Sequence, residues 1–429
     1  MPINRHPYYF RGILKMKLLL IGSGGREHAI ARKLAKNNQV EKIFCAPGNG
    51  GTKIESKCEN INLSKIDDLL KFAKENNIYL TFVGPEVPLI DGIVDIFKEN
   101  GLSIFGPDKA GAMLEGSKSF SKDFMKKYSI KTARYEVFDD AKKALIYLEK
   151  EEYPLVIKAD GLAAGKGVYI CETLEDARLA IKEIMLDDIF KGAGSKIVVE
   201  EFLDGVEASI LSITDGETIL PFVSAKDHKQ IYDGGKGPNT GGMGVIAPNP
   251  YVTKNVEKEF IEDIMLPTLY GIQKENFDFT GIIFFGIMIT KKGTYLLEYN
   301  VRMGDPETQS ILELMESDLL ELLNSAMNKS LKDFNLKWSE KSCCNVVLAS
   351  GGYPSSFIID YEIKIENNLL ENIYFAGTKE KDGKLFTSGG RVLSIVATGE
   401  SLDEAIISAY KKVKFVDFKN KYNRSDIGK

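Results

Sequence analysis

Short apolar runs alternate with helix-like segments over the first hundred residues of the chain. Four of the runs have the length and composition of buried strands: 17–22, 43–46, 80–83 and 103–105. Segments of helical composition separate them: 26–36, 65–75 and 92–99. Such alternation predicts a parallel sheet with helices on both faces. We therefore expect an α/β domain over about residues 16–107.

The pattern changes to hairpins and longer helices farther along the chain. Apolar strands on either side of glycine turns predict two antiparallel hairpins, 209–214 with 219–223 and 282–290 with 295–300. Other strands are expected at 155–159, 167–171 and 196–201. Helices are expected at 117–127, 174–185, 252–272 and 308–326. From about residue 342, short strands and glycine turns predict a small α+β domain.

Length and composition restrict the class of protein. The chain has 429 residues, 44% hydrophobic and 27% charged, which is globular composition and too long for one core. A net charge of −5 gives no electrostatic footprint for nucleic acid. The longest apolar run, 281–290, is about half of the ~20 residues that a membrane helix needs. The five cysteines are scattered along the sequence. The chain has only three histidines, so a histidine-rich zinc site is not expected.

The N-terminal segment does not resemble a secretory signal, because its apolar run is too short. Residues 1–26 contain no Asp or Glu, a feature shared with transit peptides, but Pro2 and Pro7 interrupt any helix there. We expect residues 1–15 to be an extension without a catalytic role. We also expect a cytoplasmic protein with neither nucleic acid nor membrane as partner.

The segment LLEYNVRMGDPETQ (296–309) combines strand alternation with charged residues. Glu298, Asn300 and Arg302 alternate with apolar residues, so in a strand their side chains would share one face. Carboxylate and amide oxygens are ligands that magnesium takes together with water and phosphate oxygens. An edge strand with a solvated face is the alternative. The apolar neighbour 282–289 argues against it, because buried charges need partners. The pattern predicts a floor for a metal nucleotide and a small charged substrate.

Two glycine-rich loops could hold phosphate groups. The loop at 22–27 follows a strand and opens a helix, but Glu27 occupies the third glycine position of a dinucleotide fingerprint, which disfavours NAD. Two interpretations of this loop are equally supported: it binds a single phosphate at the start of the helix, or it is a plain tight turn. The loop KADGLAAGKG (158–167) is not a Walker A motif. It could close over polyphosphate with backbone donors and two lysines, or form a mobile surface hairpin.

Two further segments are ambiguous by themselves. The strand and turn at 198–207 could bind a nucleotide, with the backbone hydrogen-bonding to the edge of adenine and Glu207 accepting from ribose hydroxyls. The alternative is an edge strand whose acidic side chains are solvated. The segment GPNTGGMG (237–244), after Asp227-His228-Lys229, suggests a backbone that approaches a ligand closely, or a flexible loop. His228 could be an acid-base group or a hydrogen-bonding residue.

Taken together, the motifs resemble one family. They are LLIGSGGREHAIA (19–31), CAPGNGGT (45–52), VGPEVPL (83–89), VIKADGLAAGKGV (156–168), GPNTGGMG and RMGDPETQ. This combination is similar to the phosphoribosylamine–glycine ligases, or glycinamide ribonucleotide synthetases, of the ATP-grasp superfamily. The resemblance implies a multidomain α/β and α+β fold: a pre-ATP-grasp parallel-sheet domain (16–117), an ATP-grasp domain (118–336) with a mobile lid (about 134–206), and a C-terminal α+β domain (337–429).

The resemblance also implies roles for individual residues. ATP would contact Lys118, Lys158, Gly165, Lys166, Gly167, Glu200, Glu201, Phe202, Leu203 and Glu207. Mg²⁺ or Mn²⁺ would bind Glu298 and Asn300, while Arg302, Lys158 and Asp227 would be catalytic. Besides Arg302, the substrates would contact Gly24, Gly25, Arg26, Glu27, Gly84, Glu86, Pro88, Asn239, Thr240, Gly241, Gly242, Met243, Asp305, Pro306 and Glu307. Strand 282–290 supplies no acid, so the number of metal ions stays open.

The implied activity joins glycine to 5-phosphoribosylamine. Glycine would be phosphorylated by ATP, and the amine would then displace phosphate from glycyl phosphate, giving glycinamide ribonucleotide for de novo purine biosynthesis. Alternatives are another ATP-grasp carboxylate ligase, a biotin-dependent carboxylase subunit, a nucleotide-binding regulator without chemistry, and a nicotinamide oxidoreductase, which Glu27 disfavours. A monomer or weak homodimer is expected.

Overall fold

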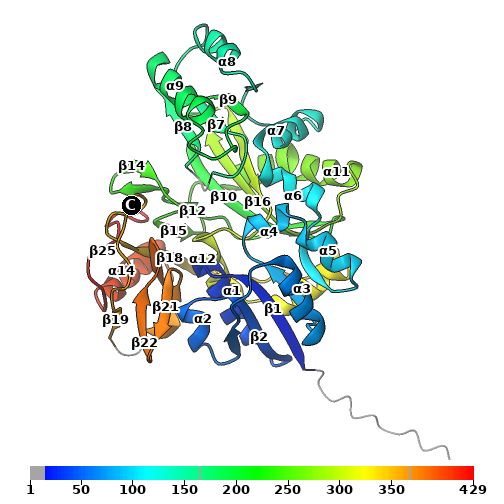
Figure 1. Ribbon diagram of the computed structural model, residues 1–429, viewed down its shortest axis with the longest axis vertical. Helices are drawn as coiled ribbons and strands as arrows, with labels where there is room; N and C mark the ends of the chain where they lie inside the picture. Colours follow the sequence, from blue (N-terminus) through cyan, green and yellow to red (C-terminus); the bar gives the residue numbers. More distant parts are fainter. Residues whose placement is uncertain (1–14, 164–165, 367–368) are drawn as a thin grey trace, which may run out of the picture.

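A computed structural model describes residues 15–163, 166–366 and 369–429. Within them, nine strands form one sheet in the order β11-β10-β16-β5-β4-β1-β2-β3, with β17 paired to β16. The N-terminal strands are parallel, as expected: β1 (Met16–Gly22), β2 (Val40–Pro47), β3 (Cys58–Asn60), β4 (Leu80–Val83) and β5 (Ile104–Pro107). The sheet continues from β5 into β16 (Phe279–Thr290) by antiparallel pairing. The N-terminal and central parts therefore share one sheet (Figure 1).

Helices cover both faces of the parallel strands, which confirms the expectation. Along β1, Leu18 and Leu20 belong to one hydrophobic core and Leu19 and Ile21 to another. The first core includes residues of α1 (Gly25–Ala35), and the second includes residues of α3 (Ile66–Glu75) and α5 (Ile93–Glu99). The short helices nearby are α2 (Gly50–Ile54), α4 (Glu86–Ile90) and α6 (Lys109–Gly116).

The central part is antiparallel and contains both predicted hairpins. They are β10 (Val206–Thr214) with β11 (Ile219–Pro221), and β16 with β17 (Gly293–Asn300). The helix α7 (Lys118–Lys127) was also expected. The long helix of the prediction is continuous over α10 (Lys254–Phe260), a π-helical segment η2 (Ile261–Met265) and α11 (Leu266–Lys274).

The single helix predicted over 308–326 is wrong. The structure has two helices, α12 (Glu307–Leu314) and α13 (Leu319–Met327). Met315 leaves the helix to form a bridge with Trp338, and the Asp318 side chain caps α13 by accepting from the Glu321 N–H. The continuous apolar pattern did not reveal this break, because the bridging partner lies beyond the segment.

Among the described residues, four strands form a small sheet that shares no strand pairing with the large one. Its order is β6 (Tyr135–Phe138), β9 (Ile197–Glu201), β7 (Leu155–Ala159) and β8 (Val168–Cys171). It packs with α8 (Ala141–Leu148), α9 (Leu174–Ile181) and η1 (Lys182–Leu186) around a core of its own. Figure 1 shows this green layer at the top, at the end of β10 and β16.

The C-terminal sheet incorporates a segment from the middle of the chain. Its path is β12 (Lys226–Asp227), β15 (Gly244–Ala247), β18 (Ser342–Ser350), β23 (Arg391–Gly399) and β20 (Ile373–Phe375), with β25 (Lys421–Tyr422) beside β18. The helix α14 (Leu402–Val413) packs on it. Smaller pairs are β13 (Gln230–Tyr232) with β14 (Lys236–Asn239), β19 (Lys364–Ile365) with β24 (Val416–Asp417), and β21 (Thr378–Lys381) with β22 (Lys384–Thr387). Two 3-10 turns are η3 (Leu331–Asp333) and η4 (Leu370–Asn372).

No helix in the described part of the chain is both long and apolar enough to cross a membrane.

Candidate active site

A cavity of about 370 Å³ lies where the large sheet, the small four-stranded sheet and the β13–β14 hairpin meet. Many of the residues singled out from the sequence line it: Glu86, Lys118, Lys158, Gly167, Glu200, Glu201, Phe202, Leu203, Glu207, Asp227, Asn239, Thr240, Gly241, Glu298, Asn300, Arg302 and Glu307. Segments more than 200 residues apart in the sequence are thus brought together.

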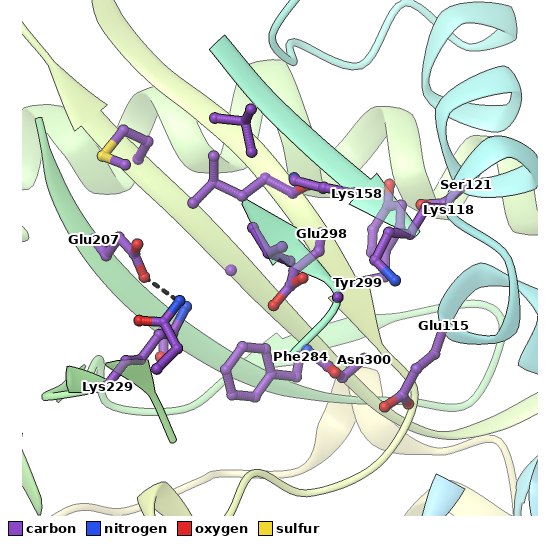
Figure 2. A pocket seen from close by; sticks show the side chains of 18 of the residues that line it. Glu115, Lys118, Ser121, Lys158, Glu207, Lys229, Phe284, Glu298, Tyr299 and Asn300 are labelled. Atoms are coloured by element: carbon purple, nitrogen blue, oxygen red, sulfur yellow. Dashed lines mark hydrogen bonds and ion pairs between the residues drawn. The ribbon is translucent and has the colours of Figure 1, made fainter. Parts of the chain in front are cut away.

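The floor of the cavity is the end of β17. Glu298 pairs with Gly286 of β16 and Asn300 pairs with Phe284. Because Gly286 has no side chain, space remains beside Glu298, and a Cβ there would lie 3.2 Å from Glu298 Cγ. Figure 2 shows Glu298 and Asn300 reaching toward the same space as Lys118 and Lys158.

Glu298 is held in its charged form. Burial would raise the pKa of its carboxyl, but nearby cations, Lys229 first and then Lys158, hold it below its usual value. The described residues contain no group of three or more His, Cys, Asp or Glu that could hold a metal by itself. A charged carboxylate and an amide oxygen fit a hard cation that takes its other ligands from phosphate and water.

Two buried ion pairs fix the lysines of the cavity. Glu200 forms ion pairs with both Lys158 (Nζ to Oε1, 2.8 Å) and Lys122 (Nζ to Oε2, 2.9 Å), and all three side chains are at least nine-tenths buried. Burial would raise the pKa of Glu200, but Lys158 and Lys122 lower it, so the acid stays charged. The Glu200 side chain is therefore occupied, and adenine recognition at 200–203 would fall to the backbone.

Arg302 is surrounded by acceptors. Its Nη2 donates to Asn300 Oδ1 (3.0 Å) and lies 2.9 Å from Glu115 Oε1, and its Nε donates to Glu86 Oε2 (3.3 Å). Glu115 also accepts from the Val301 N–H (2.8 Å). Glu115 therefore orients both the guanidinium and the backbone that carries it.

Two buried carboxylic acids also line the cavity. Glu307, at the start of α12, is 5% exposed and accepts from Ser209 Oγ (3.2 Å). Asp227 lies on β12, and its buried Oδ1 has no hydrogen-bond partner in the described structure. Burial raises the pKa of both groups, and Glu307 raises that of Asp227 further. Two such acids suit a ligand that brings an ammonium group.

Several predicted substrate residues form a network outside the cavity lining. Arg26 Nε donates to Glu27 Oε1 (2.5 Å), and the Gly24 N–H donates to Glu27 Oε2 (2.6 Å). The Arg26 N–H donates to Asp305 Oδ2 (3.4 Å). A Cβ on Gly84 would lie 2.0 Å from Glu27 Oε1, so the buried acid needs this glycine.

The remaining predicted residues have other surroundings. Gly25 approaches Gln309, Pro88 lies within α4, and Pro306 precedes α12. Met243 is fully buried with Ile231 and Ala349 and does not line the cavity. Lys166 donates to the Pro354 carbonyl (3.3 Å), and a Cβ on Gly242 would meet Asp227 and Pro306. Gly165 lies outside the described residues.

Sequence reasoning missed three charged residues of the lining: Glu115, Lys122 and Lys229. Lys229 pairs with Glu207 (2.6 Å), as the dashed line in Figure 2 shows. Burial would lower the pKa of Lys229, but Glu207 and Glu298 raise it well above its usual value. Lys229 had a signal, since it adjoins Asp227. Glu115 and Lys122 are single charges on helices and carry no motif.

Family models match three consecutive parts of the chain. They are described as the N domain (residues 16–115), the ATP-grasp (A) domain (116–308) and the C domain (343–429) of phosphoribosylglycinamide synthetase. The chain belongs to the phosphoribosylglycinamide synthetase family. This confirms the resemblance and the fold class inferred from the motifs.

Individual relatives agree with this membership. A phosphoribosylamine–glycine ligase of Clostridium acetobutylicum is 62% identical over 414 residues, covering 96% of this chain and 100% of that protein. One of Fusobacterium nucleatum is 56% identical, covering 96% and 98%. A crystal structure of the ligase from Thermotoga maritima has a TM-score of 0.86 at 36% identity, covering 96% and 100%.

The fold is also similar to that of biotin carboxylases. The biotin carboxylase domain of a Hydrogenobacter thermophilus 2-oxoglutarate carboxylase gives a TM-score of 0.73 at 14% identity, covering 96% of this chain and 92% of that one. At this identity the match shows the fold alone.

Proposed function

We propose that the protein is an ADP-forming ligase that joins glycine to 5-phosphoribosylamine through glycyl phosphate, giving glycinamide ribonucleotide for purine biosynthesis. One observation carries the proposal: Glu298, Asn300 and Arg302 line the same cavity as Lys118 and Lys158 in a chain of this family. The names of the close relatives support the choice of substrates.

The residues present fit activation of a carboxylate. A free carboxylate is a poor electrophile, and phosphorylation turns one of its oxygens into a leaving group. Lys118 and Lys158 would neutralise the polyphosphate, and Arg302 would orient the glycine carboxylate for attack on the γ-phosphate. Glu298 and Asn300 would hold Mg²⁺ or Mn²⁺, whose charge would offset that of the phosphate oxygens. No side chain has to act as a covalent nucleophile.

Asp227 and Glu307 complete the proposed glycine site. Their carboxyl groups lie in the lining of the same cavity and have raised pKa values from burial, and neither forms an ion pair in the described structure. The ammonium of glycine would give these acids a partner. Alignment of carboxylate and phosphate by such contacts can contribute about 7–11 kcal/mol to lowering the barrier.

A nucleotide-release assay tests the proposal. ADP would be measured with ATP and magnesium, with and without glycine, and with freshly generated 5-phosphoribosylamine. We expect stoichiometric ADP and amide product only when both substrates are present. Release that depends on bicarbonate would instead indicate carboxylase chemistry, and ATP binding without turnover would indicate a nucleotide-binding regulator. Either result would refute the proposed function.

We also propose a cytoplasmic enzyme that is a monomer or weak homodimer, consistent with small, charged metabolites as substrates. Sedimentation over a range of protein concentrations would measure the oligomeric state.

A further inference from the structure

The β13–β14 hairpin forms one wall of the cavity. Lys229, Gln230, Asn239, Thr240 and Gly241, at its open end, belong to the lining. Its two strands share only two residue pairs, and the register shifts between them. An isolated hairpin of this size is marginal in water. Its position must therefore depend on contacts with the rest of the molecule.

The segment Tyr422–Gly428 supplies such contacts along one strand and the turn of the hairpin. Tyr422 Oη donates to the Ile231 carbonyl (2.8 Å), and Arg424 Nη1 donates to the Gln230 carbonyl (3.0 Å). The Ser425 N–H donates to Asp233 Oδ1 (2.9 Å), and Ser425 Oγ donates to the other oxygen of Asp233. In return, the Gly234 N–H donates to Asp426 Oδ2 (2.7 Å).

The same segment also reaches the base of the hairpin through His228. His228 Nδ1 lies 3.0 Å from the Gly244 carbonyl, and its Nε2 accepts from the Gly428 N–H (3.2 Å). These partners assign a neutral ring protonated at Nδ1. Burial lowers the pKa of His228 to about 4, which agrees with that form. His228 therefore links Asp227 and Lys229 to the 422–428 segment and has no free nitrogen for acid-base chemistry.

The 422–428 segment is itself firmly held. Tyr422 pairs with Ala349 in the C-terminal sheet. Tyr410 Oη, from α14, donates to the Arg424 carbonyl (2.9 Å) and accepts from the Ile427 N–H (2.9 Å). Arg424 is 3% exposed and binds Asp426 through two hydrogen bonds of 2.8 Å. A bidentate pair of this kind fixes geometry as well as charge.

We propose that the 422–428 segment positions the β13–β14 hairpin, and that Asp233 is a positioning residue for glycine use. The C-terminal part of the chain would thereby set the shape of a cavity whose lysines, metal ligands and Arg302 come from other parts. The kinetic side of this inference rests on the proposed function; the structural side does not.

Asp233→Ala tests the inference with little risk to folding, because Asp233 is exposed. The change removes both acceptors for Ser425. We expect faster amide hydrogen exchange across 230–241 and a rise of about tenfold in the KM for glycine, the size expected for one or two lost hydrogen bonds. The kcat and the KM for ATP should change less than about twofold, because Lys118, Lys158, Glu298 and Asn300 lie outside the hairpin.

Two variants serve as controls. Asp233→Asn keeps an oxygen that can accept from the Ser425 N–H and should restore most of the glycine KM. Lys236→Ala removes an exposed side chain from the same hairpin that has no hydrogen bond to the 422–428 segment, and should change neither exchange nor KM.

Unchanged exchange across 230–241 in Asp233→Ala would overturn the inference. So would a glycine KM that stays at the wild-type value while exchange accelerates, because the hairpin would then move without affecting the site. If the wild-type protein released no ADP with glycine, the proposed function would fail, but hydrogen exchange would still decide whether the segment holds the hairpin.

Discussion

Glu298 keeps its negative charge because four cationic side chains of the cavity act on it. Its pKa is lowered, against the effect of burial, by Lys229, Lys158, Lys118 and Arg302. The Glu298→Gln substitution therefore removes the negative charge with which these four cations interact. We expect kcat to fall by about 10²–10³-fold, the range seen when one electrostatic contact to a transition state is lost. The free energy of unfolding should change by no more than about 2 kcal/mol.

Steady-state kinetics over a range of magnesium concentrations, together with denaturant unfolding, would measure both effects. Glu217→Gln, an exposed acid in the β10–β11 turn, is the matched control and should leave kcat unchanged. A Glu298→Gln enzyme with wild-type kcat at every magnesium concentration would remove Glu298 from the proposed metal site.

Arg302 has a fork of donors that a lysine cannot reproduce. Arg302→Lys should raise the KM for glycine by about tenfold or more and change the KM for ATP far less, because the two-pronged contact with a carboxylate is lost. Glycine titrations at saturating ATP would show this split. Arg134→Lys, in an exposed pair with Glu151, is the control. A normal glycine KM and a normal rate in Arg302→Lys would refute the assigned role.

The segment around Gly242 connects two elements of the site. Gly242 has φ +112°, and a Cβ there would lie 2.6 Å from Asp227 Oδ1 and 2.4 Å from Pro306 Cδ. We expect Gly242→Ala to lower kcat/KM for glycine by about tenfold or more, because both backbone strain and displacement of Asp227 act on the site.

Gly235→Ala separates these two causes. Gly235 also has a positive φ (+67°) but no atom within 4 Å of an added Cβ. It should therefore show backbone strain alone, seen as a lower melting temperature with nearly normal kcat/KM. Equal losses of kcat/KM in the two variants would mean that the contact with Asp227 is not the cause.

Elements with strong local patterns could be predicted from the sequence. The strands at 17–22 and 282–290 are continuous apolar runs, which is typical of strands buried on both faces. The alternation of Glu298, Asn300 and Arg302 correctly placed three polar side chains in one cavity. Glycine-rich loops beside strands marked further parts of its wall, including Gly167 and Gly241.

Features that depend on distant partners could not be predicted. The pairing of β15 with β18 joins Ile246 to Cys344, almost a hundred residues away, and no local pattern indicates it. The break before α13 depends on Trp338. Glu115 is one acid near the end of a helix, and its role follows only from its contact with Arg302 in the folded chain.

At the scale of the whole molecule, the N-terminal and C-terminal parts meet at a buried histidine. His28 of α1 is completely buried, its Nδ1 accepts from the Phe375 N–H of β20 (2.8 Å), and its Nε2 lies 3.0 Å from Glu55 Oε1. Arg32 extends the contact by donating to the Glu371 carbonyl (2.9 Å). The ring is therefore neutral, with its proton on Nε2, and a second proton would break the bond to Phe375.

This contact makes stability depend on pH in a definite direction. Burial lowers the pKa of His28 to about 4, although the hydrogen bond to Glu55 opposes the shift. In the unfolded chain the pKa is about 6.5. As pH falls from 6.5 to 4, the unfolded state takes up a proton that the folded state refuses, so stability falls by up to about 3 kcal/mol. His228, with its pKa also near 4, acts in the same direction.

His28→Asn isolates the contribution of His28 to the pH dependence of stability. The amide oxygen of Asn can accept from the Phe375 N–H, but the amide does not titrate. At pH 7 the variant should be less stable than the wild type, since it loses packing and the bond to Glu55. Between pH 7 and 5, however, its free energy of unfolding should fall less steeply. Glu55→Gln is the control, because the Glu55 carboxyl titrates below this pH window in the folded protein. Burial would raise its pKa, but His28 and Arg32 lower it to about 2. Parallel slopes for His28→Asn and the wild type in urea unfolding at pH 7, 6 and 5 would show that His28 is not the group that titrates.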